Sequence, residues 1–149
     1  ETGRFQAFQA VQEANPSTNQ VILSTSERRN TEVQAMTLTL DHYYRSTDAD
    51  PDLVKMDIEG AEALAVPGML SLVAEAMPKL ILEVHPEEVR ELGGSPLELI
   101  EQLREAGGYN TVQQVESYRN EITHRDQVLF PLDPSAFEDD RPVVAFFAP

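Results

Sequence analysis

Two short apolar runs, residues 53–58 and 79–84, constrain the fold of this chain more than any other feature. A strand with apolar side chains on both faces is typical of a parallel sheet that is covered on both sides. Between the two runs a helix is predicted from about Ala61 to Met77, interrupted at Pro67 and Gly68 because proline breaks the helical hydrogen-bond pattern. The sequence therefore predicts a β-α-β unit. The apolar residues of the two runs are Leu53, Val54, Met56 and Ile58, followed by Leu80, Ile81, Leu82 and Val84.

The second half of the chain continues the alternation. A helix is predicted within residues 93–108, with Ser95 as N-cap, Pro96 at the first position and Glu98 completing a capping box. Its predicted apolar stripe is Leu97, Ile100 and Leu103. Three further strands are expected, with an acidic loop at 133–142 between the last two: 109–115, 127–132 and 142–148.

This order of elements predicts an α/β fold with one mostly parallel sheet and right-handed crossovers. The last two strands have no helix between them, so we expect an antiparallel edge strand. The chain is interpreted as a single domain, residues 1–149, with its α/β core in 33–149. Residues 1–32 are weakly patterned, and we expect loops and a short hairpin there. A strand is predicted at 32–40, and Asp41 is expected to cap a short helix after it.

Charge and composition exclude several classes of protein. The net charge is −15, from 26 acidic and 11 basic residues, so nucleic acids and anionic membranes would be repelled. There is no cysteine, no signal peptide, and no apolar run near the ~20 residues of a membrane span. These features favour a cytoplasmic protein. The chain starts at Glu1 rather than methionine, which we interpret as an internal start.

Four titratable side chains are predicted to meet at one edge of the sheet. Asp57 and Glu59 follow the first buried strand, and Glu83 and His85 follow the second. Ligands of open α/β sheets bind beyond the carboxyl ends of the strands, so this edge is the candidate site.

Structural explanations exist for the same residues. Glu59 and Glu62 lie at a helix start, where the helix dipole favours acids on a solvated rim. Lys55 could simply neutralise Asp57, and His85 could be a loop histidine that bonds a backbone carbonyl.

Other kinds of site have less support. A divalent metal is chemically conceivable, because Asp57, Glu59, Glu83 and His85 offer oxygen and imidazole ligands. No dense ligand spacing supports it, so no metal site is predicted. There is no G-x-S-x-G motif and no Walker loop.

The stretch "DLVKMDIEGAEALAVPGM", followed by "PKLILEVHP", resembles the C-terminal half of the FkbM-type methyltransferases. The likeness covers roughly residues 33–110 and includes "TLD" at 39–41. The matching positions are Asp52, Lys55, Asp57, Glu59, Gly60, Glu62, Gly68, Pro78, Glu83 and His85. The resemblance implies a Rossmann-like fold and S-adenosylmethionine-dependent transfer of a methyl group, mostly to hydroxyls of small molecules or sugars.

Position and resemblance together suggest a role for each residue. His85 is the candidate base because the ordinary histidine pKa lies near neutrality, and Glu83 would orient it. Asp57 and Ile58 would lie at the methionine end of the cofactor, with Asp57 also orienting the acceptor. Glu59 and Glu62 would bind the acceptor.

The chain departs from the family pattern in one respect. The family has a glycine-rich loop after its first strand, whereas Gly3 is the only glycine before Gly60. The adenosine end of the cofactor would therefore lack its cradle, and the sheet would have an open apolar edge through which two copies could pair. The alternative function is a non-catalytic Rossmann-like module that binds a partner through that edge, with a metal-dependent hydrolase as a third interpretation.

Overall fold

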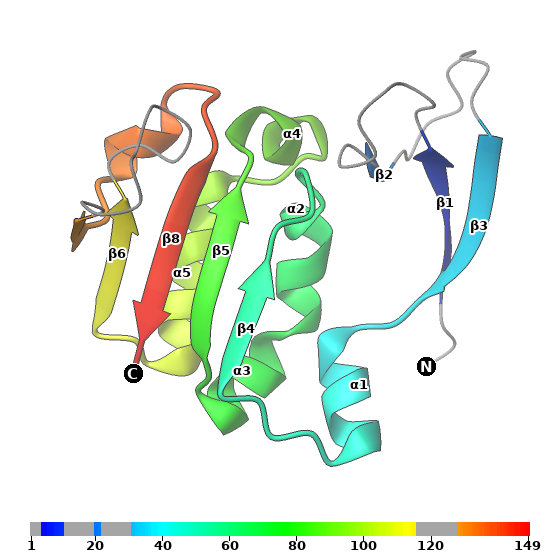
Figure 1. The fold of residues 1–149 in the computed structure, drawn as a ribbon, viewed down its shortest axis with the longest axis horizontal. Coiled ribbons are helices and arrows are strands. Elements are labelled where there is room, and N and C mark those ends of the chain that lie inside the picture. Colours follow the sequence, from blue (N-terminus) through cyan, green and yellow to red (C-terminus); the bar gives the residue numbers. More distant parts are fainter. Residues whose placement is uncertain (1–3, 11–19, 22–30, 116–127) are drawn as a thin grey trace.

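The computed structural model describes residues 4–10, 20–21, 31–115 and 128–149, which form two separate sheets (Figure 1). The larger sheet has five strands in the order β4-β5-β8-β6-β7. Their bounds are β4 Leu53–Met56, β5 Lys79–Val84, β6 Thr111–Val115, β7 Leu129–Pro131 and β8 Val143–Ala148.

The expectation of a mostly parallel sheet is wrong. Among the strand pairs of the described residues, only β4 and β5 are parallel, and β8 is antiparallel to both of its neighbours, β5 and β6. The antiparallel edge strand is β7, paired with β6. No α-helix separates β7 from β8 to carry the chain back across the sheet, and β8 returns antiparallel into the interior. Its apolar sequence suits that place, because Val143, Val144 and Ala145 are all buried.

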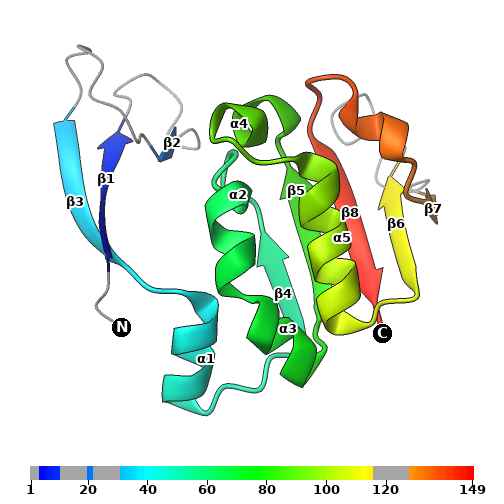
Figure 2. The same ribbon diagram turned by 180° about the vertical axis from the view of Figure 1, so that it is seen from behind.

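Helices cover one face of this sheet, as Figure 2 shows for α3 and α5. The core lies between these helices and the facing side chains of β4, β5 and β8. The expectation that the first strand is covered on both sides is therefore wrong. β4 is an edge strand of the sheet, and Leu53 is 53% exposed. The helices, including two of 3-10 type, are α2 Glu62–Ala65, η1 Val66–Gly68, α3 Leu70–Ala76, α4 Pro86–Glu91, α5 Pro96–Gly107 and η2 Pro134–Phe137.

The predicted helix starts and interruptions are largely confirmed. The helical segment after β4 is broken by η1 at Pro67 and Gly68, as expected. Ser95 is the N-cap of α5, where its hydroxyl accepts a hydrogen bond from the Glu98 N–H. The apolar stripe of α5 differs from the prediction in one position, because Leu97 is 39% exposed whereas Leu99 is buried.

The segment before β4 caps two helices. Helix α1 spans Leu40–Thr47, and its N-cap is Thr39 rather than Asp41. The Asp41 carboxylate instead accepts hydrogen bonds from the Ser71 and Leu72 N–H groups, at 3.2 and 2.8 Å, in the first turn of α3. Two residues of the "TLD" element thus satisfy free N–H groups at two helix starts.

The smaller sheet is antiparallel, with β1 between β2 and β3. The strand predicted at 32–40 is confirmed as β3, although it ends at Thr37 and lies outside the larger sheet. Within residues 1–32, where loops and a short hairpin were expected, the described residues all belong to strands, and the rest of that prediction lies outside the described residues. The bounds are β1 Arg4–Ala10, β2 Gln20–Val21 and β3 Thr31–Thr37.

Candidate functional site

The candidate site forms where the parallel strands β4 and β5 end. Met56 pairs in register with Leu82, so the residues that follow the two strands meet at the same edge of the sheet. Asp57, Glu59 and Glu62 come from the β4–α2 connection and α2, while Glu83 and His85 come from β5 and the residue after it. The predicted convergence of Asp57, Glu59, Glu83 and His85 is present in the structure.

His85 lies at the centre of this group. Its Nε2 atom is 3.2 Å from Glu59 Oε2 and 3.8 Å from Glu83 Oε1, and its Nδ1 atom is 3.6 Å from Glu62 Oε1. The side chain is 3% exposed, yet neither ring nitrogen makes a hydrogen bond within the described residues. The interpretation of His85 as a loop histidine bonded to a backbone carbonyl is therefore wrong.

Glu62 is fully buried at the first position of α2. Its Oε1 atom accepts a hydrogen bond from the Ile58 N–H at 3.1 Å, and Oε2 has no hydrogen-bond partner in the described part of the chain. A solvated-rim role is excluded for this carboxylate. The same burial places Glu62 behind His85 rather than on a surface that a ligand could reach.

A strained turn holds Glu59 against His85. Glu59 and Gly60 both have positive φ angles, 54° and 94°, and the Ala61 N–H donates to the Ile58 carbonyl across the turn at 3.2 Å. Glu59 in the left-handed region costs about 1 kcal/mol. A Cβ atom on Gly60 would lie 2.2 Å from the Cβ of Glu88 in α4, so the turn requires glycine at this position.

The remaining predicted residues lie on the exposed side of the site. Asp57 accepts a hydrogen bond from Lys55 Nζ at 3.1 Å, as one interpretation of the sequence expected. The Asp57 and Lys55 side chains are 30% and 60% exposed, so this pair adds little stability. Ile58 is 37% exposed, and its N–H donates a hydrogen bond to the Glu62 carboxylate.

The carboxylates set the electrostatics of His85. Glu62 raises the pKa of the imidazole most, by its side-chain interaction with the ring, while burial acts in the opposite direction; Glu59 and Glu83 raise it further. The net result is a pKa above the ordinary histidine value.

Three of these side chains are spaced as metal ligands can be. Asp57, Glu83 and His85 each offer one ligand atom, and the three atoms lie within 4.8 Å of one another. The sequence offered these residues as conceivable ligands but showed no dense ligand spacing, because they lie at the ends of two strands rather than in one short motif.

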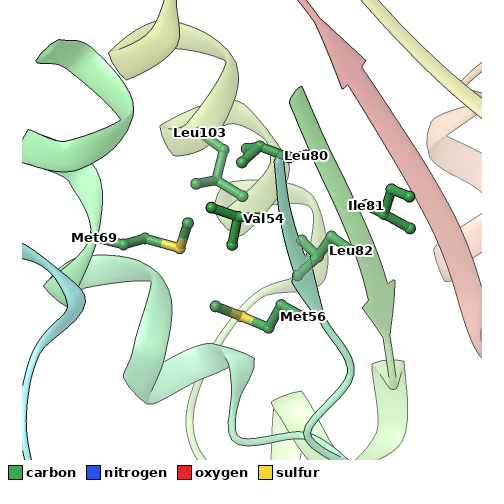
Figure 3. A pocket seen from close by; sticks show the side chains of 7 residues that line it. All are labelled: Val54, Met56, Met69, Leu80, Ile81, Leu82 and Leu103. Atoms are coloured by element: carbon green, nitrogen blue, oxygen red, sulfur yellow. The ribbon is translucent and has the colours of Figure 1, made fainter. Parts of the chain in front are cut away.

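A small cavity between the helices and the sheet is separate from this cluster (Figure 3). Side chains from β4, from α5 and from Met69, the residue before α3, meet those of β5 around it. Its lining is wholly apolar, so it is a packing defect of the core and offers no group for catalysis. The lining residues are Val54, Met56, Met69, Leu80, Ile81, Leu82 and Leu103.

A family model described as the methyltransferase FkbM domain matches residues 3–109. The chain belongs to the FkbM methyltransferase family. The match begins well before the "TLD" element and so includes the strands of the smaller sheet as well as the candidate site. No curated protein and no solved structure matches the chain.

FkbM membership implies S-adenosylmethionine-dependent methyl transfer and a Rossmann-like methyltransferase fold. The site residues fit the positively charged methionine end of this cofactor, because the carboxylates of Asp57 and Glu59 are both partly exposed at the same edge. Several residues that carry the resemblance have a structural role in this chain. Gly60 and Glu59 build the turn, and Gly68 lies against Thr39, whose Cγ2 would be 3.0 Å from an added Cβ.

Two features of the site could not be recognised in the sequence. Glu88 packs beneath Gly60 from a helix that follows β5. Asp41 fixes the start of α3 from about 30 residues upstream in the chain.

Within the described residues, no helix is long and apolar enough to span a membrane.

Proposed function

We propose that this FkbM-family chain transfers the methyl group of S-adenosylmethionine to a hydroxyl of a small molecule or sugar. The observation that carries the proposal is the convergence of Glu59, Glu83 and His85 at the carboxyl ends of β4 and β5. A hydroxyl acceptor must lose a proton as it is methylated, and this cluster offers groups that can take it.

Exposure divides the cluster into an outer and an inner part. The Asp57 and Glu59 side chains are 30% and 25% exposed, whereas His85 and Glu83 are 3% and 4% exposed. An acceptor therefore reaches Asp57 and Glu59 first. This distribution favours Glu59 as the group that receives the hydroxyl proton, with His85 behind it, although the sequence pointed to His85 itself.

Each residue of the site then has a defined task. The bound cofactor supplies an electrophilic methyl group. Glu59 accepts the proton of the acceptor hydroxyl, and the contact of its Oε2 with His85 Nε2 at 3.2 Å fixes the orientation of the carboxylate. The strained turn around Gly60 sets that geometry before the acceptor arrives, which reduces the reorganisation needed for reaction.

The inner residues act through His85. Glu62 lies on the Nδ1 side and Glu83 on the Nε2 side, so together they orient the ring. Asp57 and Ile58 are proposed to lie beside the methionine end of the cofactor, where the Asp57 carboxylate attracts positive charge.

Methyl transfer is tested by following radiolabelled methyl groups from S-adenosylmethionine into a panel of sugars and other small hydroxyl compounds. Glu59→Gln is expected to lower turnover by about 10²–10⁴-fold, the usual contribution of a positioned base. Asp50→Asn, an exposed acid at the opposite end of β4, is the matched control and should leave turnover unchanged. Wild-type turnover retained in Glu59→Gln, with loss in His85→Gln, would return the base role to His85.

A second candidate function rests on the edge strand. Leu53 of β4 is 53% exposed at the end of the sheet, which suits addition of a strand from a partner. We propose a second copy of this chain as that partner if methyl transfer and cofactor binding are both absent. Light scattering would then show a dimer, and Leu53→Lys would convert it to a monomer.

A further inference from the structure

The candidate site gathers four carboxylates around one histidine. The carboxylates of Glu59, Glu62 and Glu83 surround His85, and Asp57 lies beside them. Lys55 pairs with Asp57, and His85 lies between Glu59 and Glu62. Glu62 is fully buried, and its Oε2 atom has no hydrogen-bond partner within the described residues, so its negative charge is costly there. A cation bound close to this carboxylate would lower that cost.

The histidine gives a second, independent indication. His85 is 3% exposed and points into the carboxylates, yet both of its ring nitrogens lack hydrogen bonds within the described residues. Buried imidazoles are nearly always hydrogen-bonded or bound to a metal ion. Ring nitrogens that face carboxylate oxygens can bind a metal ion together with them, and binding of the ion displaces the proton of the ring.

Distances between the ligand atoms suit one ion. Oxygen and nitrogen ligands bind small divalent cations at about 2.0–2.2 Å, so two ligands of the same ion lie about 3–4 Å apart. His85 Nε2 is 3.8 Å from Glu83 Oε1, and the ligand atoms of Asp57, Glu83 and His85 all lie within 4.8 Å of one another. A small rotation of the partly exposed Asp57 side chain closes the set.

We infer that Asp57, Glu83 and His85 form a divalent metal site at the carboxyl ends of β4 and β5. Two carboxylates with one imidazole suit an ion that accepts both oxygen and nitrogen ligands, such as Mn²⁺. Three protein ligands leave positions open for water or a substrate oxygen. Asp57 can serve both Lys55 and the ion, because a carboxylate has two oxygens.

The chemical role of this ion rests on the proposed function, whereas its binding does not. An acceptor hydroxyl on the open side of the ion would lie next to Glu59 and would become more acidic on coordination. Its proton would pass to the Glu59 carboxylate. The ion would thus fix the acceptor oxygen and assist the same proton transfer.

Metal binding is tested on the full chain without cofactor, by titrating Mn²⁺ and following the signal of free Mn²⁺ in electron paramagnetic resonance. High salt suppresses loose binding to the acidic surface. One Mn²⁺ per chain is expected. Asp57→Asn should weaken its binding by at least about tenfold, since altering even supporting residues of metal sites has effects of that size. Asp50→Asn carries the same change at an exposed loop position and should bind as the wild type does.

Because changes at Glu83 and His85 could disturb folding, the partly exposed Asp57 carries the main test. Circular dichroism verifies that each variant is folded, and a Mn²⁺-induced rise in Tm that is lost in Asp57→Asn is the second readout. Equal affinities of Asp57→Asn and Asp50→Asn would overturn the site, as would a folded wild-type chain that leaves the Mn²⁺ signal unchanged.

Calorimetric titration with S-adenosylmethionine separates the two proposals. Mn²⁺ binding without cofactor binding would support the metal site and count against methyl transfer. Cofactor binding without Mn²⁺ binding would mean that the positive charge of the cofactor balances the carboxylates, and the metal site would be overturned.

Discussion

The two faces of strand β5 differ both in how far they are buried and in the side chains they carry. Leu80, Leu82 and Val84 face the helices and belong to the apolar core. Glu83, between two of them, faces the other way and leads to His85 and the site. Alternation along one strand thus separates residues that stabilise the fold from residues that hold the site. Burial of the apolar side chains on the first face stabilises the fold. Burial of the charged Glu83 on the second face costs stability, as is common for residues kept for function.

The largest expected effect is on the apolar face. Leu82→Ala should reduce the free energy of unfolding by about 4 kcal/mol, because Leu82 is 2% exposed and already borders the small core cavity. The comparison is Glu62→Gln, which changes a fully buried residue of the site. It should reduce the free energy of unfolding by no more than about 1 kcal/mol, because it removes a buried charge and keeps the oxygen that accepts from the Ile58 N–H.

Urea denaturation of both variants measures this difference. A loss for Glu62→Gln as large as that for Leu82→Ala would mean that the site stabilises the fold as strongly as the core does.

The next effect concerns the turn that holds Glu59. Gly60→Ala should cost about 3 kcal/mol, because the residue has a φ of 94° and the new Cβ would lie 2.2 Å from the Cβ of Glu88. Gly93→Ala is the matched control: its φ is 78°, but no atom lies within 4 Å of the added Cβ, so about 1 kcal/mol is expected. Thermal unfolding of the two variants separates the steric clash with Glu88, present only at Gly60, from the backbone strain present at both positions. Equal losses of stability would contradict the close packing of Gly60 on α4.

The apolar region contains one titratable group whose pH dependence can be tested. Burial raises the pKa of Tyr109 to about 12, and its hydroxyl donates a hydrogen bond to the Pro78 carbonyl. In the unfolded chain tyrosine ionises near pH ~10, so raising the pH favours unfolding, with loss of about 2–3 kcal/mol between pH ~10 and ~12. The stabilisation is therefore fully present below pH ~10.

Absorbance of the tyrosinate and denaturation at several pH values measure this loss. Tyr109→Phe should remove this part of the alkaline destabilisation and cost about 1 kcal/mol at neutral pH through the lost hydrogen bond. An unchanged alkaline profile in that variant would assign the loss to other groups.

The smallest effect expected is at the start of α3, which carries the core residues Leu72 and Val73. Asp41→Ala should cost about 1 kcal/mol, the usual value of a capping side chain, because two N–H groups lose their acceptor. Asp50→Ala changes an exposed acid in the loop before β4 and should be neutral. Equal stability of the two variants would show that water replaces the Asp41 carboxylate without loss.

Much of the fold could be predicted from local patterns. The break at Pro67 and Gly68 and the start of α5 at Ser95 follow from residue chemistry within a few positions, and both are confirmed. Strand direction could not be predicted in this way. β8 lies between β5 and β6 because its apolar residues are buried there, and that place depends on the whole sheet.

The residues of the site were partly predictable from the sequence, whereas which of them are buried and which are exposed was not. The positions of Asp57, Glu59, Glu83 and His85 after two apolar runs indicated that they would meet. That Glu62 is fully buried and Glu59 partly exposed depends on the turn at Gly60, which packs against Glu88 from a later helix.

By itself, the sequence determined the elements, the edge where polar residues gather and the resemblance to the FkbM family, because each is written in residues that are near one another in the chain. Only the tertiary structure decided which strand lies beside which, which carboxylates are reachable, and that three ligand atoms from two strands come within 4.8 Å. The physical reason is that burial and pairing arise from contacts between distant segments, and these contacts also determine where a buried charge can be balanced.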